Sequence, residues 1–196
     1  FLNADLTGEN IEIYGPASLT DDMADGSVSF TNGKEPLPDG LVRLGRCLLL
    51  VPLGKVDLMP PPHIAVENPR LAFSRILSKF FTPLAETRIH ATACIEKGAV
   101  IGSNPHIGAF VHIGPAVALG DNVVVGSQTV IVGKTTIGDG TAIRSNTVVG
   151  EPGFGFERDE HGIPQRIPHL GGVQIGVDCE IGALNTIASG TIEATI

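Results

Sequence analysis

Residues 88–150 read RIHATACIEKGAVIGSNPHIGAFVHIGPAVALGDNVVVGSQTVIVGKTTIGDGTAIRSNTVVG, and within them an aliphatic residue returns at every sixth position. The series is Ile89, Ile95, Ile101, Ile107, Ile113, Leu119, Val125, Ile131, Ile137, Ile143 and Val149. A six-residue period fits neither an α-helix nor a simple alternating strand, but it fits a short strand followed by a corner. The repeat therefore predicts a parallel β-helix, with coils stacked about 4.8 Å apart.

Small residues between the aliphatic positions indicate how the chain turns and packs. We expect Gly102-Ser103-Asn104, Gly120-Asp121-Asn122 and Gly138-Asp139-Gly140 to form corners, because these residue types tolerate positive φ. A small or β-branched residue precedes most aliphatic positions by two, and we expect Cys94 and Cys179 to fill such inward places as core residues.

The period is interrupted by Glu151–Gly172, EPGFGFERDEHGIPQRIPHLGG, and then returns at Ile175, Ile181 and Ile187. In repeat proteins such an insertion is a loop on one face, often the face that binds a ligand. The repeat stops in mid-register at Ile196, so we expect the β-helix of the natural protein to continue beyond this residue.

The first 84 residues have a different pattern. Short runs at 11–14, 28–30, 46–51 and 63–66 read as strands between Gly, Pro and Asp clusters. A helix is predicted from an Asn68 cap and Pro69, with Leu71, Ile76, Leu77 and Phe80 on one face, and Thr82-Pro83 ends it. The fold class is therefore β-rich, with a small α+β domain at 1–84 and a β-helix at 88–196.

Composition excludes several classes of protein. The net charge is −8 and the pI is near 5.1, which disfavours a nucleic-acid binder. Three cysteines, with Cys47 the first, form no C-x-x-C pair, so neither a disulfide framework nor a thiolate zinc site is expected, and a reducing, cytoplasmic setting fits. No apolar run is long enough for a membrane span.

A narrow β-helix buries little apolar surface for the chain that it orders. Ordering a hexad costs roughly 6 to 12 kcal/mol of backbone entropy, whereas one buried Ile or Val returns about 1.5 to 3 kcal/mol. We therefore expect other copies of the chain to cover the outer faces, and a homotrimer suits a three-sided rod.

Three motifs carry a resemblance to a known family. They are V-x-N-P-x-L-A-F-x-R at Val66–Arg75, G-F-G-F followed by G-x-x-x-R-I-P within Gly153–Pro168, and G-V-x-I-G-x-x-x-E-I-G-A at Gly172–Ala183. With the domain order, they make the whole chain similar to the UDP-3-O-acylglucosamine N-acyltransferases of lipid A biosynthesis. The resemblance implies a left-handed β-helix, a homotrimer and transfer of a 3-hydroxyacyl group from acyl carrier protein to the 2-amino group of a UDP-linked glucosamine.

The resemblance also implies where the substrate binds. Phe30, Asn32 and Lys34 match part of the family's uracil-binding segment, although Glu35 and Pro36 stand where the family has a tyrosine. Phe30 would stack on the base and Asn32 would pair with its edge. The alternative is that Phe30 belongs to the core and Asn32-Gly33 is a turn.

In the inserted loop, the candidate active-site residues are Gly153, Phe154, Gly155, Phe156, Arg166 and His169. The two phenylalanines either line the acyl or pantetheine groove or fasten the loop to the β-helix. His169 stands where the family commonly has glutamine, and it either contacts substrate or is structural. Arg158, His161 and Arg166 offer positive charge to a phosphate, or they belong to a solvated loop of mixed charge.

The family's general base is a histidine in a Q-I-A-H-type segment, which would lie beyond Ile196. No bound cofactor is implied, because the acyl donor is a thioester of acyl carrier protein or of coenzyme A. Ala188–Thr191 replaces the family's usual Asp-Arg-Gly-Ala, which leaves open a related amino sugar or donor. A non-catalytic hexapeptide scaffold is the alternative outside the enzymes.

No metal site is expected from the histidines. His106 and His112 are one hexad apart and should lie on different faces of the prism, whereas a zinc site needs convergent ligands.

Overall fold

The computed structural model describes residues 2, 4–20, 23–34, 36–37, 47–58, 62–83 and 86–196. It divides into two compact units, Phe1–Leu84 and Ala85–Ile196.

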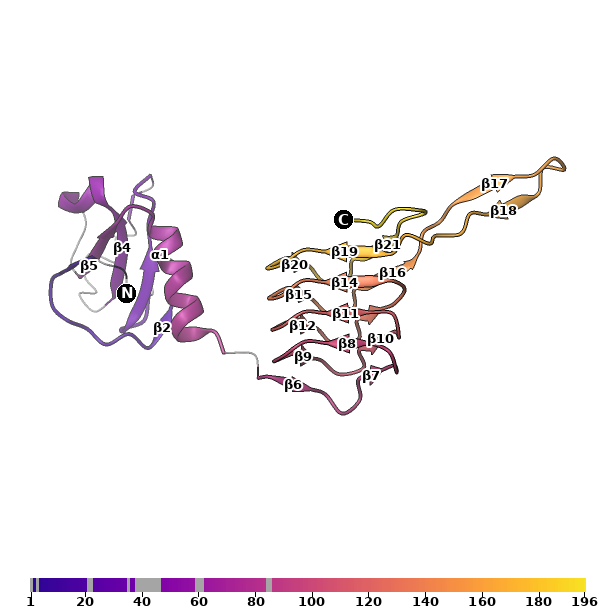
Figure 1. Cartoon of the computed structure of the whole chain (residues 1–196). Coiled ribbons are helices and arrows are strands. Elements are labelled where there is room, and N and C mark those ends of the chain that lie inside the picture. Colours follow the sequence, from indigo (N-terminus) through magenta and orange to yellow (C-terminus); the bar gives the residue numbers. More distant parts are fainter. Residues whose placement is uncertain are drawn as a thin grey trace. The chain divides into compact units, whose positions relative to one another are not determined.

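The first unit contains a five-stranded sheet in the order β1-β5-β4-β3-β2 (Figure 1). The pairs β2–β3, β3–β4 and β4–β5 are parallel, and the pair β1–β5 is antiparallel. A 3₁₀ helix, η2 (Leu53–Leu58), follows β4. The strand bounds are β1 Leu6–Thr7, β2 Gly15–Pro16, β3 Ser27–Phe30, β4 Leu48–Pro52 and β5 His63–Val66.

These bounds confirm the strands predicted at 28–30 and 63–66, and β4 corresponds to the one predicted at 46–51, whose Arg46 lies outside the described residues. The strand predicted at 11–14 is wrong, because the strand in this part of the chain, β2, begins at Gly15. Tyr14 lies just before it, and its backbone N–H donates to the carbonyl oxygen of Gly26 at 2.8 Å.

Helix α1 (Pro69–Ile76) begins as predicted. The Oδ1 atom of Asn68 accepts a hydrogen bond of 3.0 Å from the backbone N–H of Leu71, and Pro69 occupies the first position. The helix then widens into a π-turn, η3 (Leu77–Phe81), and ends at Thr82, whose hydroxyl donates to the Leu77 carbonyl at 3.0 Å. The expected helix and its end are therefore confirmed.

The buried face of this helix differs in part from the prediction. Ala72 and Ile76 are buried against the sheet, with Val28 and Leu50 opposite, whereas Leu71 is 46 % exposed and Phe80 61 % exposed. The buried stripe is thus turned away from Leu71 because the helix rests on its smallest apolar residue, Ala72.

The second unit is a parallel β-helix with three sheets of five, four and five strands (Figure 1). Each strand pairs with the strand one coil along, so Ile107 lies between Ile89 and Val125. The bounds are β6 Arg88–Ile89, β7 Cys94–Ile95, β8 Val100–Ile101, β9 His106–Ile107, β10 His112–Ile113, β11 Ala118–Leu119, β12 Val124–Val125, β13 Val130–Ile131, β14 Thr135–Ile137, β15 Ala142–Ile143, β16 Val148–Pro152, β19 Val173–Ile175, β20 Glu180–Ile181 and β21 Thr186–Ser189.

The six-residue series forms the core of this unit. Its fully buried members, which stack coil on coil, include Ile107, Ile113, Val125, Ile131 and Ile143. Thr141 and Thr147 are also buried, and their hydroxyls donate to the backbone carbonyls of Gly176 at 2.8 Å and Gly182 at 2.9 Å. These two buried hydroxyls are therefore satisfied, as a close-packed interior requires.

The corners contain two kinds of position, whereas the sequence predicts only one. Asn104, Asn122 and Gly140 do adopt positive φ, at 53°, 56° and 67°. The first glycine of each corner does not, and it serves a different purpose. A Cβ on Gly138 would lie 2.6 Å from the backbone carbonyl of Gly176 in the next coil, so only glycine permits the coils to stack there.

The two cysteines of the β-helix differ from each other. Cys179 packs against the core as expected, whereas Cys94 is exposed. The prediction for Cys94 is wrong because this residue directly precedes the inward Ile95, and neighbouring residues of a strand point to opposite faces.

Candidate functional site

The inserted loop forms a two-stranded arm that projects from the β-helix (Figure 1). Strands β17 (Phe156–Arg158) and β18 (Pro164–Arg166) pair antiparallel, with Phe156 opposite Arg166. The arm leaves the β-helix after β16 and returns at β19, in two different sheets. Its root therefore lies at a corner of the prism.

The tip of the arm is organised by Asp159. Its Oδ1 atom accepts backbone N–H groups of His161 at 3.0 Å and Ile163 at 2.9 Å, and its Oδ2 atom accepts the Gln165 side-chain amide at 2.9 Å. The hydrogen bond from Gln165, followed by that from Ile163, lowers the pKa of the Asp159 carboxyl below its usual value. The Arg158 guanidinium donates a hydrogen bond of 2.6 Å to the Gly162 carbonyl, so this side chain helps to hold the tip together.

Two phenylalanines and an arginine form a cluster nearer the root. The rings of Phe154 and Phe156 meet edge to face with centroids 4.9 Å apart, and the Arg166 guanidinium lies 5.6 Å from the Phe156 ring. Arg166 also donates to the Gly153 carbonyl at 3.3 Å. Phe154 is 92 % exposed, which argues against the alternative that it fastens the arm to the β-helix.

His169 stands at the root with one nitrogen held in place. Its Nδ1 atom lies 3.0 Å from the carbonyl oxygen of Ile167, and this contact favours the tautomer with the proton on Nδ1. In that tautomer Nε2 carries the lone pair and faces Gly153, where an added Cβ would lie only 2.6 Å away. Gly155 also borders the ring. The structure thus brings together the six loop residues predicted as a site.

A cavity of about 370 Å³ opens beside His169 at the foot of the arm. Lys134, Glu151 and Ser189 also line it, and the Ser189 hydroxyl donates to the Gly150 carbonyl at 2.7 Å. None of these three residues was predicted from the sequence. The sequence marked the neighbourhood of Lys134 in one way. Glycine follows the aliphatic residue in the neighbouring hexads, as at Gly126 and Gly138, whereas Val132 stands in that position two residues before Lys134.

In the first unit, Phe30, Asn32 and Lys34 lie at and just after the carboxyl end of β3. The Phe30 ring is half-buried and lies 5.2 Å from the Phe73 ring, so it belongs at least in part to the core. Asn32 and Lys34 are exposed, and the backbone N–H of Gly33 donates to the Thr31 hydroxyl at 3.0 Å. The chain bends at Gly33-Lys34, where Gly33 has a φ of 66°, and the side chains of Asn32 and Lys34 face solvent.

His106 lies in β9 (His106–Ile107) and His112 in β10 (His112–Ile113), and these strands belong to different sheets, as predicted. His112 pairs with Glu96, with 3.0 Å between Nε2 and Oε1, and His106 contacts the Glu86 carbonyl at 2.7 Å through Nδ1. Within the described ranges, no group of three His, Cys, Asp or Glu side chains is arranged to hold a metal ion. None of the helices in the described part of the chain is long and apolar enough to cross a membrane.

Comparison with known proteins agrees with this architecture. The profile of the family described as "Bacterial transferase hexapeptide (six repeats)" matches residues 98–133. The chain is 37 % identical to the UDP-3-O-acylglucosamine N-acyltransferase of Francisella tularensis subsp. holarctica (strain FTNF002-00 / FTA), over 220 aligned residues that cover 100 % of the chain and 65 % of the relative. The chain is thus similar along its whole length to a UDP-3-O-acylglucosamine N-acyltransferase, and residues 98–133 match the hexapeptide transferase family.

Two further relatives match a shorter segment at higher identity. Proteins of the same name from Ectopseudomonas mendocina (strain ymp) and Pseudomonas aeruginosa (strain LESB58) are 47 % identical over 53 residues, which cover 27 % of this chain and 15 % of each relative. The chain spans about two thirds of the length of the Francisella relative, at 65 %.

Proposed function

We propose that the protein is an N-acyltransferase of lipid A biosynthesis that transfers an acyl group to the 2-amino group of a UDP-linked, acylated glucosamine. The observation that carries this proposal is the 37 % identity to an enzyme of that name along the whole chain, through both structural units. The arm with its root cavity supports it, because it is the one segment of 88–187 that leaves the hexad register and still has a defined geometry.

The reaction joins an amine nitrogen to a thioester carbonyl carbon and releases a thiol. It needs a base for the amine proton and a donor for the oxyanion. In our proposal the principal base is the family histidine expected beyond Ile196, and His169 orients substrate at the root of the arm through Nε2. The fixed Nδ1 contact to Ile167 suits that role, since it leaves Nε2 as an acceptor.

The arm is proposed to form one wall of the donor groove. An acyl or pantetheine chain is apolar along much of its length, and Phe154 and Phe156 offer exposed rings to it. Arg166 is held against Phe156 and by the Gly153 carbonyl, which leaves further guanidinium N–H groups for a phosphate. We favour acyl carrier protein as the donor, and acyl-coenzyme A is the alternative that shares this chemistry.

The nucleotide is proposed to bind at the loop after β3. Asn32 tests this better than Phe30, because Phe30 also packs on Phe73 and its removal would disturb the core. Asn32→Ala should weaken binding of UDP by roughly tenfold with unchanged stability, since an amide pairing with the base contributes about 1 kcal/mol or more. Ser74→Ala, on the exposed side of α1, is the control. Equal affinity in the natural protein and both variants would remove the nucleotide from this loop.

A homotrimer is proposed for the assembly. Five outward positions of the central coils are apolar and half-buried, namely Ala118, Val124, Val130, Ala142 and Val148. Such faces suit contact with other copies of the chain. Sedimentation equilibrium should give three times the chain mass, and a folded monomer at micromolar concentration would contradict the assembly.

The decisive experiment is a product assay on the purified protein. UDP-linked 3-O-acylglucosamine is incubated with either a 3-hydroxyacyl carrier protein or the matching acyl-coenzyme A, and products are identified by mass spectrometry. We expect one added acyl group as an amide, formed with the carrier protein. No product with either donor from a folded protein would favour the non-catalytic scaffold.

A second assay tests the arm. Phe154→Ala should lower kcat/KM at least tenfold without loss of stability, because its ring is exposed and takes no part in the core. Ile163→Ala, an exposed residue at the tip, is the matched control and should leave kcat/KM within about twofold. Equal activity of the two variants would show that the aromatic cluster does not contact substrate.

A further inference from the structure

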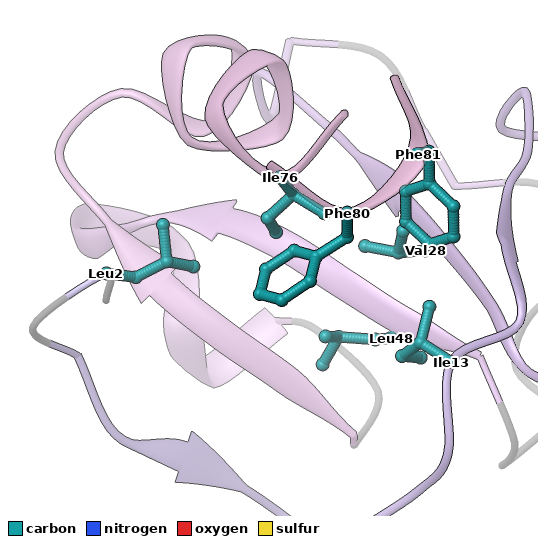
Figure 2. Close-up of a pocket in the computed structure, with 7 residues that line it drawn as sticks. All are labelled: Leu2, Ile13, Val28, Leu48, Ile76, Phe80 and Phe81. Carbon is teal, nitrogen blue, oxygen red and sulfur yellow. The ribbon is translucent and has the colours of Figure 1, made fainter. Parts of the chain in front are cut away.

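A cavity of about 470 Å³ lies between the sheet and the helix of the first unit. Figure 2 shows the side chains gathered around it, and every one of them is apolar. The described residues that line it are Leu2, Ile13, Val28, Leu48, Ile76, Phe80 and Phe81. We propose that this cavity binds the unbranched alkyl chain of an acyl group.

Its floor comes from the sheet. Val28 and Leu48 are register partners on β3 and β4, near the amino ends of both strands. Two residues further along β3 lies Phe30, at the opposite, carboxyl end. The cavity is therefore distinct from the loop proposed for the nucleotide, although both belong to the same unit.

Its roof comes from the end of the helix. Ile76 and Phe80, four residues apart, share a helix face, and the π-turn over Leu77–Phe81 brings Phe81 to the same cavity. A π-turn interrupts the regular hydrogen bonding of a helix and is found frequently at functional sites. Here it provides two aromatic walls where a continuing α-helix would turn one ring away.

The size and lining of the cavity point to a hydrocarbon. Its volume of about 470 Å³ falls within the range of small-molecule sites. A polar ligand would lose its hydrogen bonds to water and find no side-chain partner among these described residues, whereas an alkyl chain loses nothing.

The mouth of the cavity is suited to a chain with a polar end. Phe80 is 61 % exposed, so the cavity reaches solvent there. The Lys79 ammonium lies 5.4 Å from the Phe80 ring and places a positive charge beside the opening. A carboxylate, phosphate or other polar head would thus remain in water near Lys79 while the chain enters.

The assignment of the chain to an acyl group rests on the proposed function, whereas the binding of a hydrocarbon chain does not. Two molecules of the proposed reaction carry such a chain, the acylated sugar and the acyl donor. The two share the chemistry that the cavity recognises, and the experiment separates them.

Phe80→Trp provides a direct probe, because the chain contains no other tryptophan. Saturated fatty acids of about eight to sixteen carbons, kept below their micelle concentrations, should shift its emission to shorter wavelength. The affinity should rise about fourfold with each added methylene until the cavity is full. UDP-linked 3-O-acylglucosamine and an acyl thioester are then titrated separately, and the tighter binder identifies the chain's source.

A blocking variant tests the location. Leu48→Phe in the Phe80→Trp background adds volume inside the cavity and should weaken binding at least tenfold. Ser78→Phe adds the same ring on the exposed side of the same turn and should leave the affinity unchanged. Ile13→Phe is the second blocking variant if circular dichroism shows that Leu48→Phe is unfolded.

The proposal is overturned if no fatty acid shifts the emission of the folded reporter, or if the blocking variants bind as tightly as the Ser78→Phe control. Failure of the proposed function gives a different pattern, in which chains bind at the cavity and no acyl transfer is detected. Acyl transfer by a protein whose Phe80→Trp reporter binds no fatty acid would reject the cavity as a chain-binding site and leave the proposed function standing.

Discussion

The backbone N–H of Asp121 donates a hydrogen bond of 2.8 Å to the Oδ1 atom of Asp139, one coil away in the β-helix. The same arrangement recurs below it, where the Ser103 N–H donates to the Asp121 Oδ1 atom at 2.6 Å. Aspartates at one corner therefore tie successive coils together with charge-assisted bonds, in addition to the strand pairing on the faces.

Removal of this acceptor should loosen the corner. Asp139→Ala leaves the Asp121 N–H without its partner and should lower the free energy of unfolding by about 1 to 2 kcal/mol. Asp139→Asn keeps an Oδ1 acceptor and should lose less than half as much. Urea unfolding followed by circular dichroism measures both, and equal losses would show that the side-chain acceptor is unimportant.

The close approach of coils at Gly138 makes a second prediction. Gly138→Ala should lower the free energy of unfolding by about 1 to 3 kcal/mol, because its Cβ would meet the backbone of Gly176 at 2.6 Å and backbone cannot move aside easily. Gly114→Ala is the matched control in the same place of another hexad, where the nearest atom is the Val132 Cα at 3.3 Å. The control should cost clearly less, and a reversed order would contradict the steric explanation.

The tip of the arm should respond to acid. The folded-state pKa of Asp159 is lowered below its ordinary value of about 3.9, so its ionised form stabilises the tip above that pH. This contribution is lost as the pH falls through the lowered pKa, and the amide signals of His161 and Ile163 should then shift in NMR spectra. Gln165→Ala removes the largest cause and should move the midpoint upward. An unchanged midpoint would contradict the assigned cause.

The cysteines should differ sharply in reactivity. Burial raises the pKa of the Cys47 thiol, with Asp25 adding to the effect against a hydrogen bond at the Ser27 backbone, so little thiolate forms near neutral pH. Cys94 is exposed on the outer side of β7. A maleimide reagent followed by mass spectrometry should label Cys94 in the folded chain well before Cys47. Slow labelling of Cys94 that becomes fast on dilution would show that the proposed homotrimer covers this end of the face as well.

The sequence by itself determined the course of the β-helix. From Ile89 to Val149 a short strand is followed by a corner every six residues, so the position of each inward residue follows from its place in the repeat. The inserted arm, the helix cap at Asn68 and the gathering of Arg166 and His169 on one loop followed from similarly local signals.

Tertiary structure alone decided what depends on residues far apart in the chain. The need for glycine at Gly138 comes from the coil that carries Gly176, and the cavity at the foot of the arm joins Lys134 and Ser189 to His169 from separate coils. The apolar cavity of the first unit lies between the end of the helix, which widens at Leu77, and the sheet residues Val28 and Leu48. Periodicity fixes which way a side chain points, but only the stacking of coils and layers fixes what it meets.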